Sequence, residues 1–184
     1  MIYYNKIIID DSIAKSRVDS WYLKHLEGKY SKYISDTLFC NDREEVREEN
    51  GVKIYAGKDR LLLGKSPVLT CTQQNDRFTV NDEKNGNGDL TYPVALLTAD
   101  EAVFAGAITS DFTTYLGKSI FWTMTPINLE ERQSDMFLFY SSSIGLIDNF
   151  SDGSYEIRPV INLKSDVKFS GDGTIDNPYV IITE

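Results

Sequence analysis

Histidine and cysteine are nearly absent from this chain, which contains one histidine and two cysteines. A Ser-His-Asp or Cys-His mechanism would have to use His25, because there is no other histidine. His25 follows Trp21 by one turn of an expected helix, near the C-terminal end, where the helix dipole favours positive charge. Zinc sites need three or four closely spaced His or Cys ligands. We therefore expect neither histidine-dependent catalysis nor a zinc site.

Long apolar runs and an excess of basic residues are also missing. The longest apolar runs, such as residues 179–183, are far shorter than the roughly twenty residues of a membrane span. Twenty-eight acidic against nineteen basic residues give a net charge of -9, which repels nucleic acids and anionic bilayers. Residues 1–10 do not resemble a signal peptide. The sequence thus argues against nucleic-acid partners and membrane insertion, and fits either a cytoplasmic protein or part of a longer chain.

Phosphate-binding and paired-carboxylate motifs are missing as well. The chain has no G-x-x-x-x-G-K-[ST] sequence, and the Asn- and Gly-rich residues 85–89 form a polar turn with no helix after it. Asp100 and Glu101 are adjacent, whereas acid/base pairs face each other across a substrate. We therefore expect a non-enzymatic protein without catalytic residues.

Oxygen ligands suited to calcium cluster in two loops, residues 148–152 and residues 172–177. Neither loop has the EF-hand spacing, and Asp-Gly and Asn-Pro pairs are ordinary turn chemistry. No cofactor is therefore expected, although a structural calcium ion remains an open alternative.

The length of 184 residues and the 41% hydrophobic content predict a single domain over residues 1–184 with one substantial core. We expect a helical part over residues 1–37, a loop-rich part over residues 38–97, and a capped helix with a β-rich part over residues 98–184. Helices first and a meandering, mostly antiparallel sheet afterwards indicate an α+β domain.

The first third of the sequence predicts a strand over residues 2–9, followed by a helix. Ser12 supplies the N-cap and Gly28 the stop. The apolar side of this helix contains Ile13, Val18, Trp21, Tyr22 and Leu26. A second short helical stretch is expected over residues 30–36. Residues 44–70 are charged, and we interpret them as an irregular surface excursion.

A capping box begins the last part of the chain. The Thr98 hydroxyl is expected to accept from the Glu101 amide while the Glu101 carboxylate accepts from the Thr98 amide. The resulting short helix runs to about Ala105 and ends at Gly106. Six β-prone runs follow, over residues 120–125, 136–141, 144–147, 157–163, 167–169 and 179–182.

Each cysteine is soon followed by an Asn-Asp-Arg triplet. Asn and Asp close turns, and each Arg is expected to pair with a nearby carboxylate. A disulfide would add about 3 to 4 kcal/mol of stability, and two reduced thiols are the alternative. The residues with this expected structural role are Cys40, Cys71, Asp42, Arg43, Asp76 and Arg77.

Arg158 enters an apolar strand immediately before Pro159. A guanidinium in that position needs a carboxylate partner, and removal of a buried pair would cost about 3 kcal/mol or more. We therefore expect a structural role for Arg158.

Eleven tyrosines and two tryptophans supply ring faces that suit sugars or protein hot spots. Most of these rings must be core, and the apolar neighbours of Trp122 favour packing for it too. Nearby Ser, Asp and Asn side chains supply adaptable hydrogen bonds. The candidate ligand-binding residues are Trp122, Tyr140, Ser142, Asp148, Asn149 and Tyr155.

Several segments together resemble a large bacterial family of surface-type domains of unknown function. They are residues 21–22, 39–43, 75–78, 92–101, 121–126 and 158–165, so the match covers nearly the whole chain. The pattern of a tryptophan strand ending in Thr-Pro and a closing Arg-Pro-Val-Ile strand is similar to the C-type lectin-like fold. That fold is shared with formylglycine-generating enzymes and with the variable proteins of diversity-generating retroelements.

The resemblance implies an exported or surface-anchored setting, and hence a disulfide between Cys40 and Cys71. The lectin calcium motifs Glu-Pro-Asn and Trp-Asn-Asp are absent, as is the paired-cysteine metal centre of the formylglycine enzymes. The resemblance therefore implies an extracellular-type binding domain for a glycan or protein. A structural or adhesive module that packs against other domains is the alternative, and an unrecognised hydrolase is a third.

Overall fold

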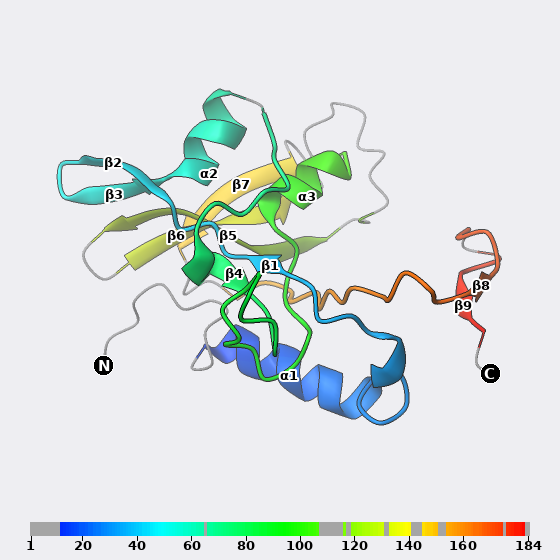
Figure 1. Ribbon diagram of the computed structural model, residues 1–184. Helices are drawn as coiled ribbons and strands as arrows, with labels where there is room; N and C mark the ends of the chain where they lie inside the picture. The colour runs from blue at the N-terminus through cyan, green and yellow to red at the C-terminus, as the bar shows by residue number, and fades with distance from the viewer. Residues whose placement is uncertain are drawn as a thin grey trace.

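The computed structural model describes residues 12–64, 66–106, 116, 119–130, 133–140, 145–150, 154–174 and 176–182 (Figure 1). Within residues 133–150, side chains are described for Met136 alone. The strand predicted over residues 2–9 lies outside the described residues.

A five-stranded antiparallel sheet with the order β2-β3-β5-β6-β7 forms the centre of the fold. Its strands are β2 (Glu45–Glu49), β3 (Val52–Tyr55), β5 (Ile120–Glu130), β6 (Gln133–Tyr140) and β7 (Gly145–Phe150). Two small antiparallel pairs accompany it, β1 (Phe39–Cys40) with β4 (Arg77–Phe78) and β8 (Phe169–Ser170) with β9 (Val180–Ile181). The helices are α1 (Ile13–His25), α2 (Ala56–Lys58) and α3 (Ala99–Phe104), with 3-10 turns at Ser31–Tyr33 and Gln74–Asp76 and a π-helical turn at Asp59–Leu63. The α+β class predicted from the sequence is confirmed.

The hairpin of β2 and β3 corrects the prediction that residues 44–70 are irregular. Asn50 and Gly51 connect the strands with φ values of 52° and 83°, the positive φ that a tight two-residue hairpin turn requires. β3 then pairs with β5 in the central sheet. The many charges misled the interpretation because β2 is an exposed edge strand, where charged side chains block pairing with other chains.

β5 crosses the middle of the molecule and is buried from Phe121 through Ile127. The strand predicted over residues 120–125 therefore continues to Glu130. Pro126 lies inside it, and the register with β6 shifts on both sides of this proline. Such irregularities accommodate a residue that has no amide proton for the ladder.

Two hydrophobic cores meet at β5. The main core contains Val18, Tyr22, Ile34, Phe39, Phe78, Leu90, Val94, Ala95, Leu96, Trp122, Met124 and Met136. The second core contains Leu61, Ala99, Ala102, Phe121 and Ile127. Neighbouring residues of β5 thus serve different cores, as the alternating directions of strand side chains require.

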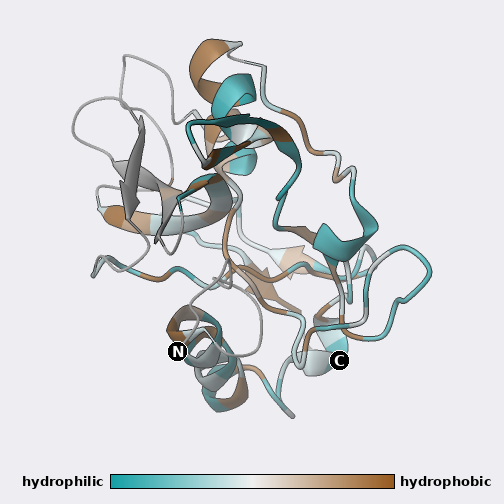
Figure 2. Ribbon diagram, turned by 90° about the vertical axis from the view of Figure 1, so that its left-hand side faces the viewer, coloured by the Kyte–Doolittle hydropathy of each residue, from teal (hydrophilic) through white to brown (hydrophobic). Residues whose placement is uncertain are grey.

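α1 begins at the predicted cap, where the Ser12 hydroxyl accepts from the Lys15 amide at 2.9 Å. Val18 and Tyr22 are buried and Trp21 and Leu26 pack against the main core as predicted, whereas Ile13 lies outside and Lys15 is buried instead. Ile13 is 69% exposed, and Lys15 is buried and paired with Asp19 one turn away. In Figure 2, α1 accordingly has both teal (hydrophilic) and brown (hydrophobic) residues along its length.

The chain after Tyr155 runs extended across the main core without forming the strand predicted over residues 157–163. The Trp122 amide donates to the Glu156 carbonyl at 3.0 Å, and Ala95 and Val160 exchange two hydrogen bonds. Further along, the Ser35 amide donates to the Asn162 carbonyl at 2.8 Å. The segment pairs with three different parts of the chain in turn, and therefore forms isolated bridges instead of one ladder.

Candidate functional site

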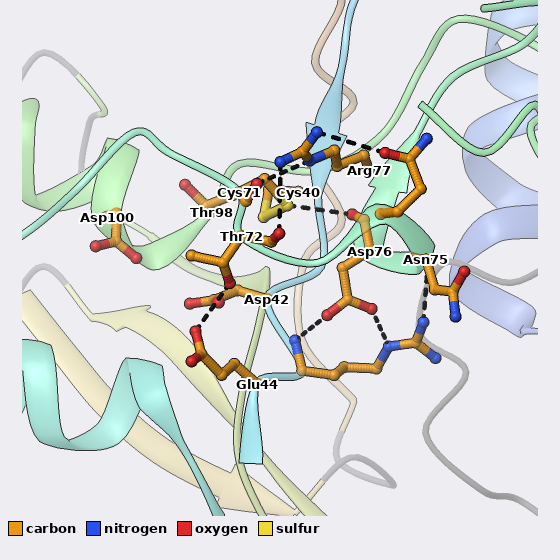
Figure 3. Close-up of a disulfide and its surroundings, with 12 residues drawn as sticks. Cys40, Asp42, Glu44, Cys71, Thr72, Asn75, Asp76, Arg77, Thr98 and Asp100 are labelled. Atoms are coloured by element: carbon orange, nitrogen blue, oxygen red, sulfur yellow. Dashed lines mark hydrogen bonds and ion pairs between the residues drawn. A yellow bond between two sulfur atoms is a disulfide. The ribbon is translucent and has the colours of Figure 1, made fainter. Parts of the chain in front are cut away.

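A disulfide joins Cys40 and Cys71, with an S–S distance of 2.05 Å (Figure 3). Cys40 ends β1, and Cys71 precedes β4, the strand that pairs with β1. The bond therefore closes the base of a loop whose two ends already lie side by side. This confirms the predicted disulfide.

The first Asn-Asp-Arg triplet binds the second one beside the disulfide. The Asp76 carboxylate accepts from the Arg43 amide at 2.5 Å and from Arg43 Nε at 2.6 Å, and the Asn41 amide donates to the Asp76 carbonyl. In Figure 3, two dashed lines run from the Asp76 carboxylate to nitrogen atoms. The predicted pairing of Arg43 with a carboxylate is confirmed.

Arg77 behaves differently from its counterpart Arg43. Its Nε donates to the Cys71 carbonyl at 2.8 Å, and its Nη atoms lie 3.4 Å from the Thr72 carbonyl and the Gln74 amide oxygen. The predicted carboxylate partner is wrong, because Asp76 of its own triplet already accepts from Arg43. Arg77 instead holds the backbone on the Cys71 side of the disulfide.

Arg60 connects two buried carboxylates that are far apart in the sequence. Its Nε and Nη2 donate to the two oxygens of Asp100 at 2.8 and 2.7 Å, and Nη2 also lies 2.5 Å from Asp42 Oδ2. The side chains of Arg60, Asp42 and Asp100 are 17%, 9% and 5% exposed. The Val68 amide adds a fourth contact, to Asp100 Oδ1 at 2.8 Å. We call Arg60, Asp42 and Asp100 the Arg60 triad.

Sequence reasoning missed the Arg60 triad. Arg60 lies in the stretch that was interpreted as a surface excursion, and Asp100 was considered only as a neighbour of Glu101. Ion pairs across 18 and 40 residues of sequence have no spacing signature. The nearest signal is Asp100 in the first turn of α3, where the capping box left it unexplained.

Burial raises the pKa of Asp42 above its ordinary value; the hydrogen bond from Arg60 opposes this rise, and the negative charges of Asp100 and Asp76 add to it. For Arg60, burial lowers the pKa, but its hydrogen bonds to Asp100 and Asp42 outweigh burial and leave that pKa raised. Arg60 therefore stays a cation, and Asp42 has a raised affinity for a proton.

Because the pKa of Asp42 is raised, its contribution to the stability of the folded protein depends on pH in one direction. The pKa of Asp42 in the folded protein lies above the unfolded value of 3.8, so the folded protein binds a proton at Asp42 more tightly than the unfolded chain does. The contribution of Asp42 to the unfolding free energy therefore grows as the pH falls. Asp42→Asn is a matched variant, because Asn tolerates the positive φ of 39° at this position. We expect the unfolding free energy of the wild type to increase relative to Asp42→Asn between neutral pH and about pH 4 in urea titrations. A constant or falling difference would contradict the assignment.

The predicted capping box is confirmed. Thr98 Oγ1 accepts from the Glu101 amide at 3.0 Å, and Glu101 Oε2 accepts from the Thr98 amide at 2.8 Å. Gly106 follows the helix with a φ of 95°. The Ala99 amide also donates to Thr125 Oγ1 at 2.9 Å. These bonds fix the first turn of α3 on β5 and direct Asp100 toward Arg60.

Arg158 has the carboxylate partner that the sequence predicts, Glu156, but the pair is not buried. Its guanidinium donates to the Leu116 carbonyl and to Ser119 Oγ, and it lies 4.3 Å from the centre of the Phe121 ring. The nearest carboxylate oxygen of Glu156 is 3.6 Å away, and both side chains are about one-third or more exposed. Solvent screens such a pair, so the two hydrogen bonds and the packing over Phe121 hold the guanidinium.

Of the candidate ligand-binding residues, the side chains of Trp122 and Tyr155 alone are described, so a common surface for all six stays a prediction. Trp122 is 6% exposed in the main core, and its ring meets the half-buried Tyr155 ring edge-on at 5.2 Å. Tyr140 lies in β6, and Asp148 and Asn149 lie in β7 opposite Phe137 and Met136; their side chains are outside the description. Ser142 lies outside the described residues.

The β8–β9 hairpin presents the apolar surface that sequence reasoning missed. Tyr179 is 64% and Val180 56% exposed, and Phe169 and Ile182 are also exposed. The rings of Phe169 and Tyr179 lie side by side, with their centres 5.9 Å apart. Figure 1 shows this hairpin set apart from the central sheet. The sequence predicted strands here but gave no sign that they would lack a covering layer.

The loop of this hairpin uses its candidate calcium ligands for turn formation. The Thr174 side-chain hydroxyl and amide donate to Asp172 Oδ1 at 2.7 and 3.0 Å, which lowers the pKa of that carboxyl. Across the described residues, no cluster of three or more His, Cys, Asp or Glu suited to a metal ion occurs. Of the other candidate loop, residues 151–153 lie outside the description.

None of the described helices is long and apolar enough to cross a membrane. Comparisons of the chain with protein-family models, curated proteins and solved structures found no match.

Proposed function

We propose that this protein is a non-enzymatic binding domain of the extracellular type, with a C-type lectin-like fold, that binds a protein ligand through the β8–β9 hairpin. The fold assignment rests on the tryptophan strand and the Arg-Pro segment of the sequence, and the α+β arrangement is compatible with it. The Cys40–Cys71 disulfide supports the extracellular setting, because such bonds persist mainly in oxidising compartments.

The exposed apolar surface of the hairpin carries the proposal. The exposed rings of Phe169 and Tyr179 lie against each other, and exposed apolar side chains with a polar surround are typical of protein interaction sites. Tyr179 offers a large, rigid ring with few rotatable bonds, which is the chemistry of binding hot spots. A glycan can stack on the same ring beside Asp172 and Thr174, so glycans belong in the test.

The test is a binding screen of the intact chain against extracellular proteins and a glycan array. We expect a protein ligand whose affinity falls at least about tenfold in Tyr179→Ser/Val180→Ser. Leu23→Ser is the matched control, because Leu23 is an exposed apolar residue on α1, and it should leave binding unchanged. Equal binding by all three proteins, or no ligand in either panel, would contradict the proposal.

A structural module that packs against other domains of a larger surface protein is the second candidate. The same uncovered hairpin favours it, since a neighbouring domain is an alternative cover. Two results together would favour this candidate over ligand binding. The binding screen would find no ligand, and the protein would self-associate with increasing concentration unless it carried Tyr179→Ser/Val180→Ser.

A further inference from the structure

The stretch from Leu62 to Asn75 is attached to the rest of the molecule in an unusual way. Of its described side chains, Cys71 alone is buried, at 7% exposure. The others are exposed or half-buried, including the apolar side chains of Leu63 and Leu69. The disulfide is therefore the one point where a described side chain of this stretch enters the interior.

Both boundaries of the stretch are held without the disulfide. On the N-terminal side, Leu61 packs in the second core and Arg60 binds Asp42 and Asp100. On the C-terminal side, Asp76 binds Arg43. Phe78 of β4 follows it in the main core and pairs with Phe39 of β1. Loss of the disulfide would therefore not separate the strands that it joins.

Within the stretch, the remaining described contacts to other parts of the chain are hydrogen bonds, several of them to exposed partners. The Val68 amide binds the buried Asp100 carboxylate, Thr72 Oγ1 binds Glu44, and the carbonyls of Cys71 and Thr72 accept from Arg77. At the C-terminal end, Gln74 Nε2 donates to the Gly86 carbonyl, and the Asn75 carbonyl accepts from Arg43 Nη2 and Asn87 Nδ2. Apart from the bond to the buried Asp100 carboxylate, these hydrogen bonds exchange with water at little net cost. Segments with few buried apolar contacts open locally at low free energy.

We propose that the Cys40–Cys71 disulfide is a redox-controlled latch for residues 62–75, and that its reduction releases this segment while the sheet and both cores stay folded. A small dithiol is the reductant. It transfers two electrons and two protons to the S–S bond, giving two cysteine thiols while its own sulfurs form a disulfide. The released segment carries exposed leucines, so the redox state sets how firmly one apolar part of the surface is held.

Hydrogen exchange with mass spectrometry tests this on the intact chain, before and after reduction by a dithiol. We expect exchange in peptides covering residues 62–75 to accelerate at least about tenfold. Peptides from α1, β3 and β5 should keep their protection. Cys40→Ser/Cys71→Ser should show the reduced pattern from the start, and the dithiol should not change it.

Two results would overturn the proposal. Loss of protection in β3 and β5 on reduction would show that the disulfide holds the whole fold. Unchanged exchange over residues 62–75, in both the reduced protein and the double serine variant, would show that the surface hydrogen bonds suffice to hold the segment.

Discussion

Arg60→Met should lower the unfolding free energy by about 3 to 5 kcal/mol, which is the typical effect of removing one partner from a buried ion pair. Asp42 and Asp100 would both remain in the interior without a cation, and Asp100 would keep only the Val68 amide among its described partners. Urea unfolding at neutral pH measures the difference directly.

Arg47→Met is the matched control for this experiment. Arg47 also contacts two carboxylates, Glu49 and Asp59, but all three side chains are about one-third or more exposed. Solvent screening limits such contacts to about 1 kcal/mol or less. If both variants lost the same unfolding free energy, the Arg60 triad would stabilise the fold no more than a surface ion pair does.

Trp122→Ala should destabilise the protein by about 3 to 5 kcal/mol, because it removes a large buried ring and leaves a cavity. Trp122 packs in the main core, and the half-buried Tyr155 leans against its edge. Trp122→Phe should recover a large part of the loss. Thermal and urea unfolding give the measurement.

Tyr179→Ala is the control for Trp122→Ala, because it removes an aromatic ring from the surface and not from the core. Tyr179 is largely exposed, so its truncation should cost less than about 0.5 kcal/mol. A small effect for Trp122→Ala would mean that its ring is not part of the core, and would restore it as a candidate ligand contact.

Local sequence chemistry predicted the parts of this fold whose cause lies within a few residues. The Ser12 cap and the Thr98–Glu101 capping box depend on groups three residues apart, and both are present. The pairing of Cys40 with Cys71 was left open by the residues, and the resemblance favoured it correctly.

The features that sequence reasoning missed depend on tertiary position. Arg60 meets Asp42 and Asp100 because the sheet brings α2, the adjoining π-helical turn and α3 together, and no local pattern signals this. The Asn50–Gly51 turn did give a local signal, but the glutamates of the edge strand obscured it. The exposure of Tyr179 could not be predicted, because a continuous apolar run such as residues 179–182 normally indicates a buried strand.

The most direct test of the account is a hydrogen-exchange footprint of the protein with a ligand identified in the binding screen. We expect new protection over residues 169–182, the β8–β9 hairpin, and none over β5, which carries Trp122 in the main core. Protection elsewhere, with the hairpin exchanging as fast as in the free protein, would contradict the central claim that this hairpin is the binding surface.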